Sequence, residues 1–380
     1  MFRHFLLLLC SFVFAIQVVV IAGCGGSSSK AAASGGSGSG GGNGPSPNAA
    51  SVCGGKGSGY NNQNGSVSGV WIQSPAPGQN ESTVQVNANG YATVPITQWT
   101  VCLDGQPAYQ TNSDATSISH SITMTAGQHL LWATVTDAKG DSNRSEVRLI
   151  QVGPAPPSST VLPTPPGNAQ VLNQMQNDST WGICSLCAAG TNTSSNYWMK
   201  PSQSQPSLSG SSLEMYAGGQ SWTNVLFMDT KLGTNNSTHF LWDFYVYHDP
   251  ADEDHFWSSE FDFWQVLGGK EFMIGSQCDF GDGYWAMWDT EGDRWVLNDI
   301  PCTHWTPGWH HVQWYLERIS PTQYRYDTLV FDGKAYGLNQ SWNFGSTTWQ
   351  DMIGVQFQLD QDTSGTPLHE WVDNVTLTIW

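Results

Sequence analysis

The segment that decides the fold is Ser259-Glu260-Phe261-Asp262-Phe263-Trp264-Gln265-Val266. Successive side chains of a β-strand point to opposite faces of the sheet, so this alternation predicts a strand with Phe261 and Phe263 in the core. Glu260, Asp262 and Trp264 then point the other way. Three more segments alternate in the same manner, namely 239–249, 309–318 and 353–360. The pattern predicts an all-β sandwich in this part of the chain.

The polar sides of these four strands carry amides, carboxylates and aromatic rings. Such a surface suits sugars, because their C–H faces stack on aromatic rings and their hydroxyls exchange hydrogen bonds with amides and carboxylates. The alternative is a polar outer face that only meets solvent, but a ring as large as Trp264 is rarely placed on a wet face without a partner. The candidate ligand-binding residues are Trp264, Gln265, Asp243, Tyr245, Tyr247, Gln313, Tyr315, Gln356 and Gln358.

The composition excludes one large class of function. The 380 residues include 13 Lys and Arg against 31 Asp and Glu, which gives a formal net charge of -18. A chain of this charge repels polyanions, so nucleic acid is not an expected partner. The acidic excess lies entirely after residue 168, together with 16 of the 19 Trp. We therefore expect the function to lie in this C-terminal part.

The chain divides into five segments. Residues 1–24 are expected to be a signal peptide and 25–65 a flexible Gly/Ser-rich tether. Short alternating runs between turn residues predict a β-sandwich of immunoglobulin size over 66–153. Six Pro residues make 154–168 a stiff linker, and 169–380 forms the large sandwich. The segments 99–105 and 126–140 also resemble bacterial Ig-like domains, which implies a spacer role for the smaller sandwich.

The N-terminus predicts export and anchoring. Arg3 precedes an apolar run of about 16 residues, which is short for a transmembrane helix. The small residues before Cys24 resemble the lipobox of bacterial lipoproteins, which implies that Cys24 is lipidated. Gly25 favours the outer membrane by the same resemblance. The alternative is an ordinary cleaved signal peptide that leaves Cys24 free.

Six cysteines follow Cys24, and an oxidising compartment favours disulfides between them. Their positions suggest three pairs, namely Cys53 with Cys102, Cys184 with Cys187, and Cys278 with Cys302. The close pair Cys184 and Cys187 also matches a C-x-x-C motif. Redox or metal roles stay open for that motif, although it has no second C-x-x-C to complete a zinc site.

The segment 259–265 resembles the catalytic strand of the concanavalin A-like lectin and glucanase superfamily, in particular glycoside hydrolase family 16. Supporting stretches are Gly308-Trp309-His310-His311-Val312, Phe331-Asp332-Gly333 and Trp371-Val372-Asp373-Asn374-Val375. The resemblance covers residues 170–380. It implies an all-β fold in which an Ig-like sandwich precedes a concanavalin A-like jelly-roll sandwich.

The family strand carries a nucleophilic Glu, an assisting Asp and a Glu as general acid/base. The resemblance implies that Glu260 and Asp262 are the first two, and that they are catalytic if the protein is an enzyme. The third position holds Trp264, or Gln265 if the strand has a bulge, and neither can deliver a proton. Glu271 or Glu317 from a neighbouring strand could supply the acid instead, or an inverting geometry could use a more distant carboxylate.

The segment His248-Asp249-Pro250-Ala251-Asp252-Glu253-Asp254-His255 is a dense acidic loop. It could bind a structural calcium ion, which prefers several oxygen ligands. It does not have EF-hand spacing, so a solvated loop is the simpler interpretation. We assign no metal ligands and expect no other cofactor.

We interpret the sequence as a lipid-anchored envelope protein whose concave face binds a polysaccharide. The alternatives are a divergent endo-glycanase and a structural or adhesive protein. A glycanase requires a second carboxylate close to Glu260, whereas a binding protein predicts a shallow aromatic groove without one. An adhesive protein predicts a flat face with Trp264 packed under a loop. The glycan and the oligomeric state are not predicted.

Overall fold

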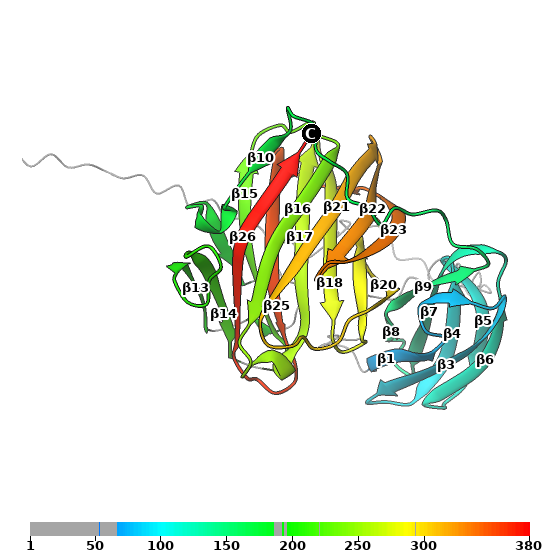
Figure 1. Cartoon of the computed structure of the whole chain (residues 1–380). Coiled ribbons are helices and arrows are strands. Elements are labelled where there is room, and N and C mark those ends of the chain that lie inside the picture. Colours follow the sequence, from blue (N-terminus) through cyan, green and yellow to red (C-terminus); the bar gives the residue numbers. More distant parts are fainter. Residues whose placement is uncertain (1–52, 54–66, 186–191, 194–195, 220, 293) are drawn as a thin grey trace, which may run out of the picture.

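The computed structural model describes residues 53, 67–185, 192–193, 196–219, 221–292 and 294–380. The described residues are almost entirely β-strands, with two single-turn 3-10 helices. The predicted all-β fold is therefore confirmed, and it consists of two β-sandwiches (Figure 1). No helix within the described residues is long and apolar enough to cross a membrane.

The smaller sandwich contains the first nine strands. They are β1 (Val67–Ser74), β2 (Gly78–Asn80), β3 (Thr83–Ala92), β4 (Ile96–Leu103), β5 (Gln106–Asn112), β6 (Ser117–Thr123), β7 (Gly127–Asp137), β8 (Ser142–Arg144) and β9 (Val147–Val152). One sheet has the order β1-β3-β6, and the facing strands have the order β9-β7-β4-β5. Alternating apolar residues such as Val86, Trp99 and Val135 fill the space between them.

The large sandwich has two sheets. The eight-stranded sheet has the order β13-β14-β26-β16-β21-β22-β23, with β10 also paired to β26. Its strands are β10 (Gln170–Leu172), β13 (Asn196–Gln203), β14 (Ser212–Gly218), β16 (His239–His248), β21 (Trp309–Ser320), β22 (Gln323–Phe331), β23 (Lys334–Asn343) and β26 (Leu368–Ile379). We call the outer side of this sheet the aromatic face, for the rings described below.

The facing sheet has the order β11-β15-β25-β17-β18-β19-β20, with β12 paired to β15 and β24 to β18. We call its outer side the carboxyl face. Its strands are β11 (Trp181–Cys184), β12 (Asn192–Thr193), β15 (Thr223–Leu232), β17 (Phe256–Leu267), β18 (Lys270–Asp279), β19 (Tyr284–Asp289), β20 (Arg294–Pro301), β24 (Gly345–Ser346) and β25 (Met352–Gln361). The 3-10 helices are η1 (Met175–Asn177) and η2 (Glu253–His255).

The core of the large sandwich consists of the apolar rows that alternation predicts. Phe240, Trp242, Phe244 and Val246 of β16 meet Phe261 and Phe263 of β17 across the two sheets. Val312, Trp314 and Leu316 of β21 and the row from Ile353 to Leu359 of β25 complete the same cluster. The division of each strand into an inner and an outer side is thus confirmed.

The two sandwiches share one continuous sheet. Strand β9 of the smaller sandwich pairs in parallel with β20 of the large one, through Val147 with Val296 and Arg148 with Leu297. An apolar cluster at this junction joins Val296 and Trp342 to Trp132 and the Cys53–Cys102 disulfide. The smaller sandwich is therefore packed directly against the large one (Figure 1).

Two of the three suggested disulfides are confirmed, Cys53–Cys102 and Cys278–Cys302. The third suggestion cannot be followed, because Cys187 lies outside the described residues. The expected signal peptide, Cys24 and most of the expected tether also lie outside them.

Candidate functional site

The predicted ligand-binding residues lie on two opposite faces. Strands β17 and β25 belong to the sheet with the carboxyl face, whereas β16 and β21 belong to the eight-stranded sheet. The prediction that all four strands present one shared surface was therefore wrong. Alternation reports whether a side chain points into the core or away from it. It does not report in which of two sheets a strand lies.

Four predicted residues do come together on the carboxyl face. Glu260 of β17 is paired with Gln358 of β25, and Asp262 is paired with Gln356 in the same register. On the other side of β17, Glu260 is paired with Gln277 of β18. All five side chains are buried, with Glu260 at 6% and Asp262 at 1% exposure. The face thus holds a compact cluster of carboxyl and amide groups.

A third carboxyl group, which the sequence did not single out, completes this cluster. The amide nitrogen Nε2 of Gln358 donates to Oε2 of Glu260 at 2.7 Å and to Oδ1 of Asp360 at 3.0 Å. The Asp360 carboxylate also accepts a hydrogen bond from Ser258 at 2.8 Å. One amide nitrogen therefore bridges the carboxyl groups of Glu260 and Asp360.

Burial raises the pKa of all three carboxyl groups. For Glu260, the charges of Asp262 and Asp360 add to burial, and its pKa lies well above the ordinary value. Burial raises the pKa of Asp262 to about 7, against the lowering effect of a hydrogen bond with Glu260. Burial raises the pKa of Asp360 to about 6, although hydrogen bonds from Ser258 and Gln358 lower it. The cluster therefore contains both protonated and ionised carboxyls near neutral pH.

Several polar atoms in this cluster lack a hydrogen-bond partner. They are Oδ1 of Asp262 and both side-chain polar atoms of Gln356, and all three are buried. An unpaired buried polar atom costs free energy, about 1–3 kcal/mol each. A native structure keeps such groups where a ligand or ordered water completes them. A hydroxyl group or an ordered water molecule would complete these atoms.

Two pairs of tryptophans accompany the carboxyl cluster. Trp288 and Trp295 contact each other edge to face at 5.2 Å, and a Cβ at Gly275 would lie 2.8 Å from Oδ1 of Asp262 and 3.0 to 3.2 Å from atoms of the two tryptophans. At the start of β17, Trp257 contacts Trp222 at 5.2 Å. All four rings are half-buried. Sequence reasoning missed them, because their positions depend on strand pairing and turns rather than on one strand's alternation.

Trp264 and Gln265 do not contribute to the site. Trp264 is fully buried and contacts Trp349 of the loop before β25 at 5.3 Å. Gln265 points into the sandwich, where it donates to the backbone oxygens of Asn235 and Ser237 and accepts from Arg318. The predictions for both residues were wrong. The Trp264 ring is buried by packing, and the side-chain amide of Gln265 is hydrogen-bonded within the protein.

The two acids expected as replacements for the missing family glutamate also lie elsewhere. Glu271 of β18 is paired with Val266, far along β17 from Glu260. Glu317 belongs to β21 in the opposite sheet. Asp360 of β25, in contrast, shares a hydrogen-bond donor with Glu260. Of these three acids, Asp360 is thus the one that shares a contact with Glu260.

The remaining predicted residues lie on the aromatic face. Asp243 accepts hydrogen bonds from His311 at 2.8 Å and from Gln313 at 2.6 Å. Tyr245 stacks on His311 at 4.1 Å, and Tyr247 contacts Trp309. These side chains are half-buried and keep part of their surface open. Tyr315 is a correction, because it is only 7% exposed and its hydroxyl is bonded to His239 and Glu317.

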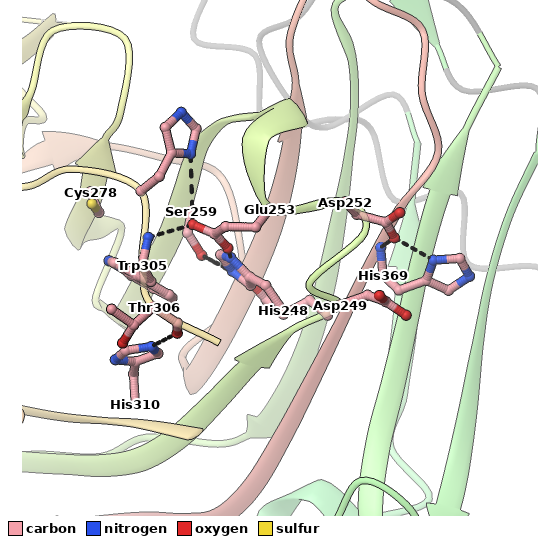
Figure 2. A network of polar contacts seen from close by, with 12 residues as sticks. His248, Asp249, Asp252, Glu253, Ser259, Cys278, Trp305, Thr306, His310 and His369 are labelled. Atoms are coloured by element: carbon pink, nitrogen blue, oxygen red, sulfur yellow. Dashed lines mark hydrogen bonds and ion pairs between the residues drawn. The ribbon is translucent and has the colours of Figure 1, made fainter. Parts of the chain in front are cut away.

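The acidic loop contributes to a buried histidine network (Figure 2). His248 contacts Glu253 at 2.5 Å through Nδ1 and Glu370 at 3.0 Å through Nε2. Nε2 also lies 3.2 Å from the Ser259 hydroxyl. Burial lowers the pKa of His248, but the two glutamates outweigh it and raise the pKa overall. With both ring nitrogens occupied, His248 connects β16 to η2 and to β26.

Asp252 of the same loop is bound by His369 at 2.6 Å, as Figure 2 also shows. The carboxylates of Asp252 and Glu253 are therefore both paired with histidine side chains. Over the described ranges, no group of three or more His, Cys, Asp and Glu side chains is arranged to hold a metal ion. The loop therefore forms part of a polar network within the fold.

No family model and no curated protein matches this chain. Among solved structures, a carbohydrate-binding module of the β-sandwich superfamily aligns at 12% identity over 80% of this chain and 96% of its own, with a TM-score of 0.29. Arcelin-5, a lectin-like defence protein from Phaseolus vulgaris, aligns at 12% identity over 56% and 99%, with a TM-score of 0.35. The carbohydrate recognition domain of Emp47p aligns at 7% identity over 57% and 99%, with a TM-score of 0.32. Likeness at this level does not extend beyond the β-sandwich type, so function has to be inferred from the residues of this chain.

Proposed function

We propose that the protein binds a polysaccharide on the carboxyl face of the large sandwich. The observation that carries this proposal is a buried cluster of carboxyl and amide groups with unpaired polar atoms, accompanied by half-buried tryptophans. Indole rings stack on the C–H faces of sugars, and the polar atoms pair with sugar hydroxyls. The net charge of -18 favours a neutral glycan over an anionic one.

Binding is tested with purified protein and a panel of soluble β-glucans, galactans and xylans, by affinity electrophoresis and calorimetry. Trp295→Ala removes a ring beside Asp262 and is expected to weaken binding about tenfold, which corresponds to about 1.4 kcal/mol. The matched control is Trp71→Ala, because Trp71 is 46% exposed on the smaller sandwich. Equal binding by Trp295→Ala and the wild type would contradict the proposed face.

A second candidate function is glycoside cleavage at the same face, and the position of Asp360 favours it. Retaining glycosidases use two carboxyl groups about 5 to 5.5 Å apart, one protonated and one ionised. Glu260, whose pKa is raised well above its ordinary value by burial and by the charges of Asp262 and Asp360, is suited to donate its proton to the leaving oxygen. Asp360, whose pKa is about 6, is suited to attack the anomeric carbon. Water then releases the sugar from Asp360 and returns a proton to Glu260.

These roles are the reverse of those that the family resemblance implies for Glu260. The test is release of reducing ends from the same panel by the wild type, Glu260→Gln and Asp360→Asn. Cleavage that both substitutions abolish would establish the enzyme. Binding without any release would leave the carboxyl face as a binding site. A purely adhesive role is favoured by the packing of Trp264 under its loop, but it does not account for the unpaired polar atoms.

We also propose that the protein is anchored in the cell envelope through a lipid on Cys24. The lipobox-like sequence before Cys24 supports lipidation, and the Gly/Ser-rich segment after it supports a tether that holds the sandwiches away from an outer membrane. Metabolic labelling with a clickable fatty acid tests this proposal. Cys24→Ser is expected to abolish the label and to release the protein from the membrane fraction. A labelled Cys24→Ser variant would contradict the assignment.

A further inference from the structure

The aromatic face carries a row of rings that the function proposed above does not use. The row crosses five adjacent strands and consists of Trp198, Tyr216, His369, Trp371, Tyr247 and Trp309. Ring centroids on neighbouring strands lie 4.8 to 5.7 Å apart. With strands spaced about 4.8 Å apart, the row is about 19 Å long. That length matches several units of an extended glycan.

These rings do not belong to the core. Each lies at an outward position of its strand, between core residues such as Met215, Val246 and Val372. Five of the six rings keep part of their surface open, and Trp371 is 7% exposed. The indole nitrogen of Trp371 also has no acceptor. Five rings of the row are therefore half-buried and keep part of their surface at the outside of the sheet.

The chain covers another part of the same face with its own linker. Thr328 of β22 donates to the backbone oxygen of Ser159 at 3.1 Å, and Asn339 of β23 donates to that of Pro157 at 2.8 Å. A side chain at Gly337 would collide with Ser158. The linker thus occupies β22 and β23 and leaves the aromatic row on β13, β14, β26, β16 and β21 open.

The charges beside the row favour a neutral partner. His369 binds Asp252 at 2.6 Å, and Asp243 accepts from His311 and Gln313. Lys200 lies 3.7 Å above the Trp198 ring and 3.9 Å from Glu214. His369, Asp243 and Lys200 are thus each held by another side chain of this protein. A second copy of a chain with net charge -18 would be repelled at long range, which disfavours self-association here.

We propose that the aromatic row is a second glycan-binding surface, on the side of the sandwich opposite the carboxyl face, and that it binds a neutral polysaccharide lying across the strands. The two faces belong to the two sheets of one sandwich, so one molecule can hold two glycan chains at once. This inference goes beyond the function proposed above, because it does not depend on any residue of the carboxyl face.

The test uses the full protein with the polysaccharide panel described above and measures two quantities. Affinity electrophoresis reports binding, and light scattering reports the bridging of long chains, which needs two binding surfaces. Trp198→Ala on the edge strand β13 and Tyr247→Ala in the middle of the row remove rings of this surface. Trp295→Ala alters the other face, and Trp71→Ala is the control. Circular dichroism and thermal melting establish that each variant is folded.

We expect Trp198→Ala and Tyr247→Ala each to weaken binding to at least one neutral polysaccharide about tenfold and to abolish bridging. Binding through the aromatic row should persist in Trp295→Ala, which separates failure of this proposal from failure of the carboxyl face. Folded row variants that bind and bridge like the wild type would overturn the proposal. So would a wild-type protein that binds no neutral polysaccharide, or a dimer that Tyr247→Ala converts to monomer in sedimentation experiments.

Discussion

Replacing Asp262 with Asn is expected to stabilise the protein above neutral pH. Burial raises the pKa of this carboxyl from 3.8 to about 7. The folded state thus binds the proton more tightly than the unfolded state, and stability falls as pH rises from about 4 to about 7. At about 1.4 kcal/mol per pKa unit, the loss for this group is about 4 kcal/mol at pH 8. Asn cannot ionise, so Asp262→Asn avoids this loss.

Urea unfolding followed by tryptophan fluorescence measures this effect at pH 4, 6 and 8. The difference between Asp262→Asn and the wild type should be small at pH 4 and grow to as much as about 4 kcal/mol at pH 8. Asp254→Asn is the control, because Asp254 is exposed on the loop before β17. A variant that is no more stable than the wild type at pH 8, or equally stabilised at all three values, would refute the reasoning.

Three further changes test other parts of the structure. Trp264→Ala should cost about 3–5 kcal/mol of unfolding free energy in urea, yet leave the affinity of the folded protein for glycans unchanged, because the ring is fully buried under Trp349. His248→Gln should cost about 3–5 kcal/mol of unfolding free energy at pH 6 and less at pH 9. The reason is that the stability from a raised histidine pKa is present below pH 6.5 and is lost as pH rises through that pKa. A cost that does not change with pH would contradict the raised pKa of His248. Replacing Cys278 and Cys302 together by Ser should cost about 3 kcal/mol, measured by urea unfolding, since their disulfide closes a segment with a sequence separation of 24 residues.

The sequence predicts the strands well because their apolar rows are long and regular. The row of Phe240, Trp242 and Phe244 points into the core as alternation requires. Glu260 and Asp262 are likewise placed together, because they lie two residues apart on one strand. These features are local, so one strand is enough to infer them.

The sheet to which a strand belongs is not local. Gln313 and Gln358 both alternate with core residues, but pairing with β16 places one on the aromatic face and pairing with β17 places the other on the carboxyl face. The burial of Trp264 depends in the same way on the loop that carries Trp349. Asp360 joins the site only because β25 lies beside β17. Such neighbours are set by the chain topology, which hydrophobic periodicity does not encode.

The shared sheet at the β9 and β20 junction also determines how the protein responds to mechanical load. A pull applied at Cys53 passes through its disulfide to Cys102 on β4, and from there through β7 and β9 into β20. The hydrogen bonds along this path belong to the same sheet that carries Glu260 and Asp360. Tension applied between Cys53 and the large sandwich would therefore be transmitted along one connected set of paired strands.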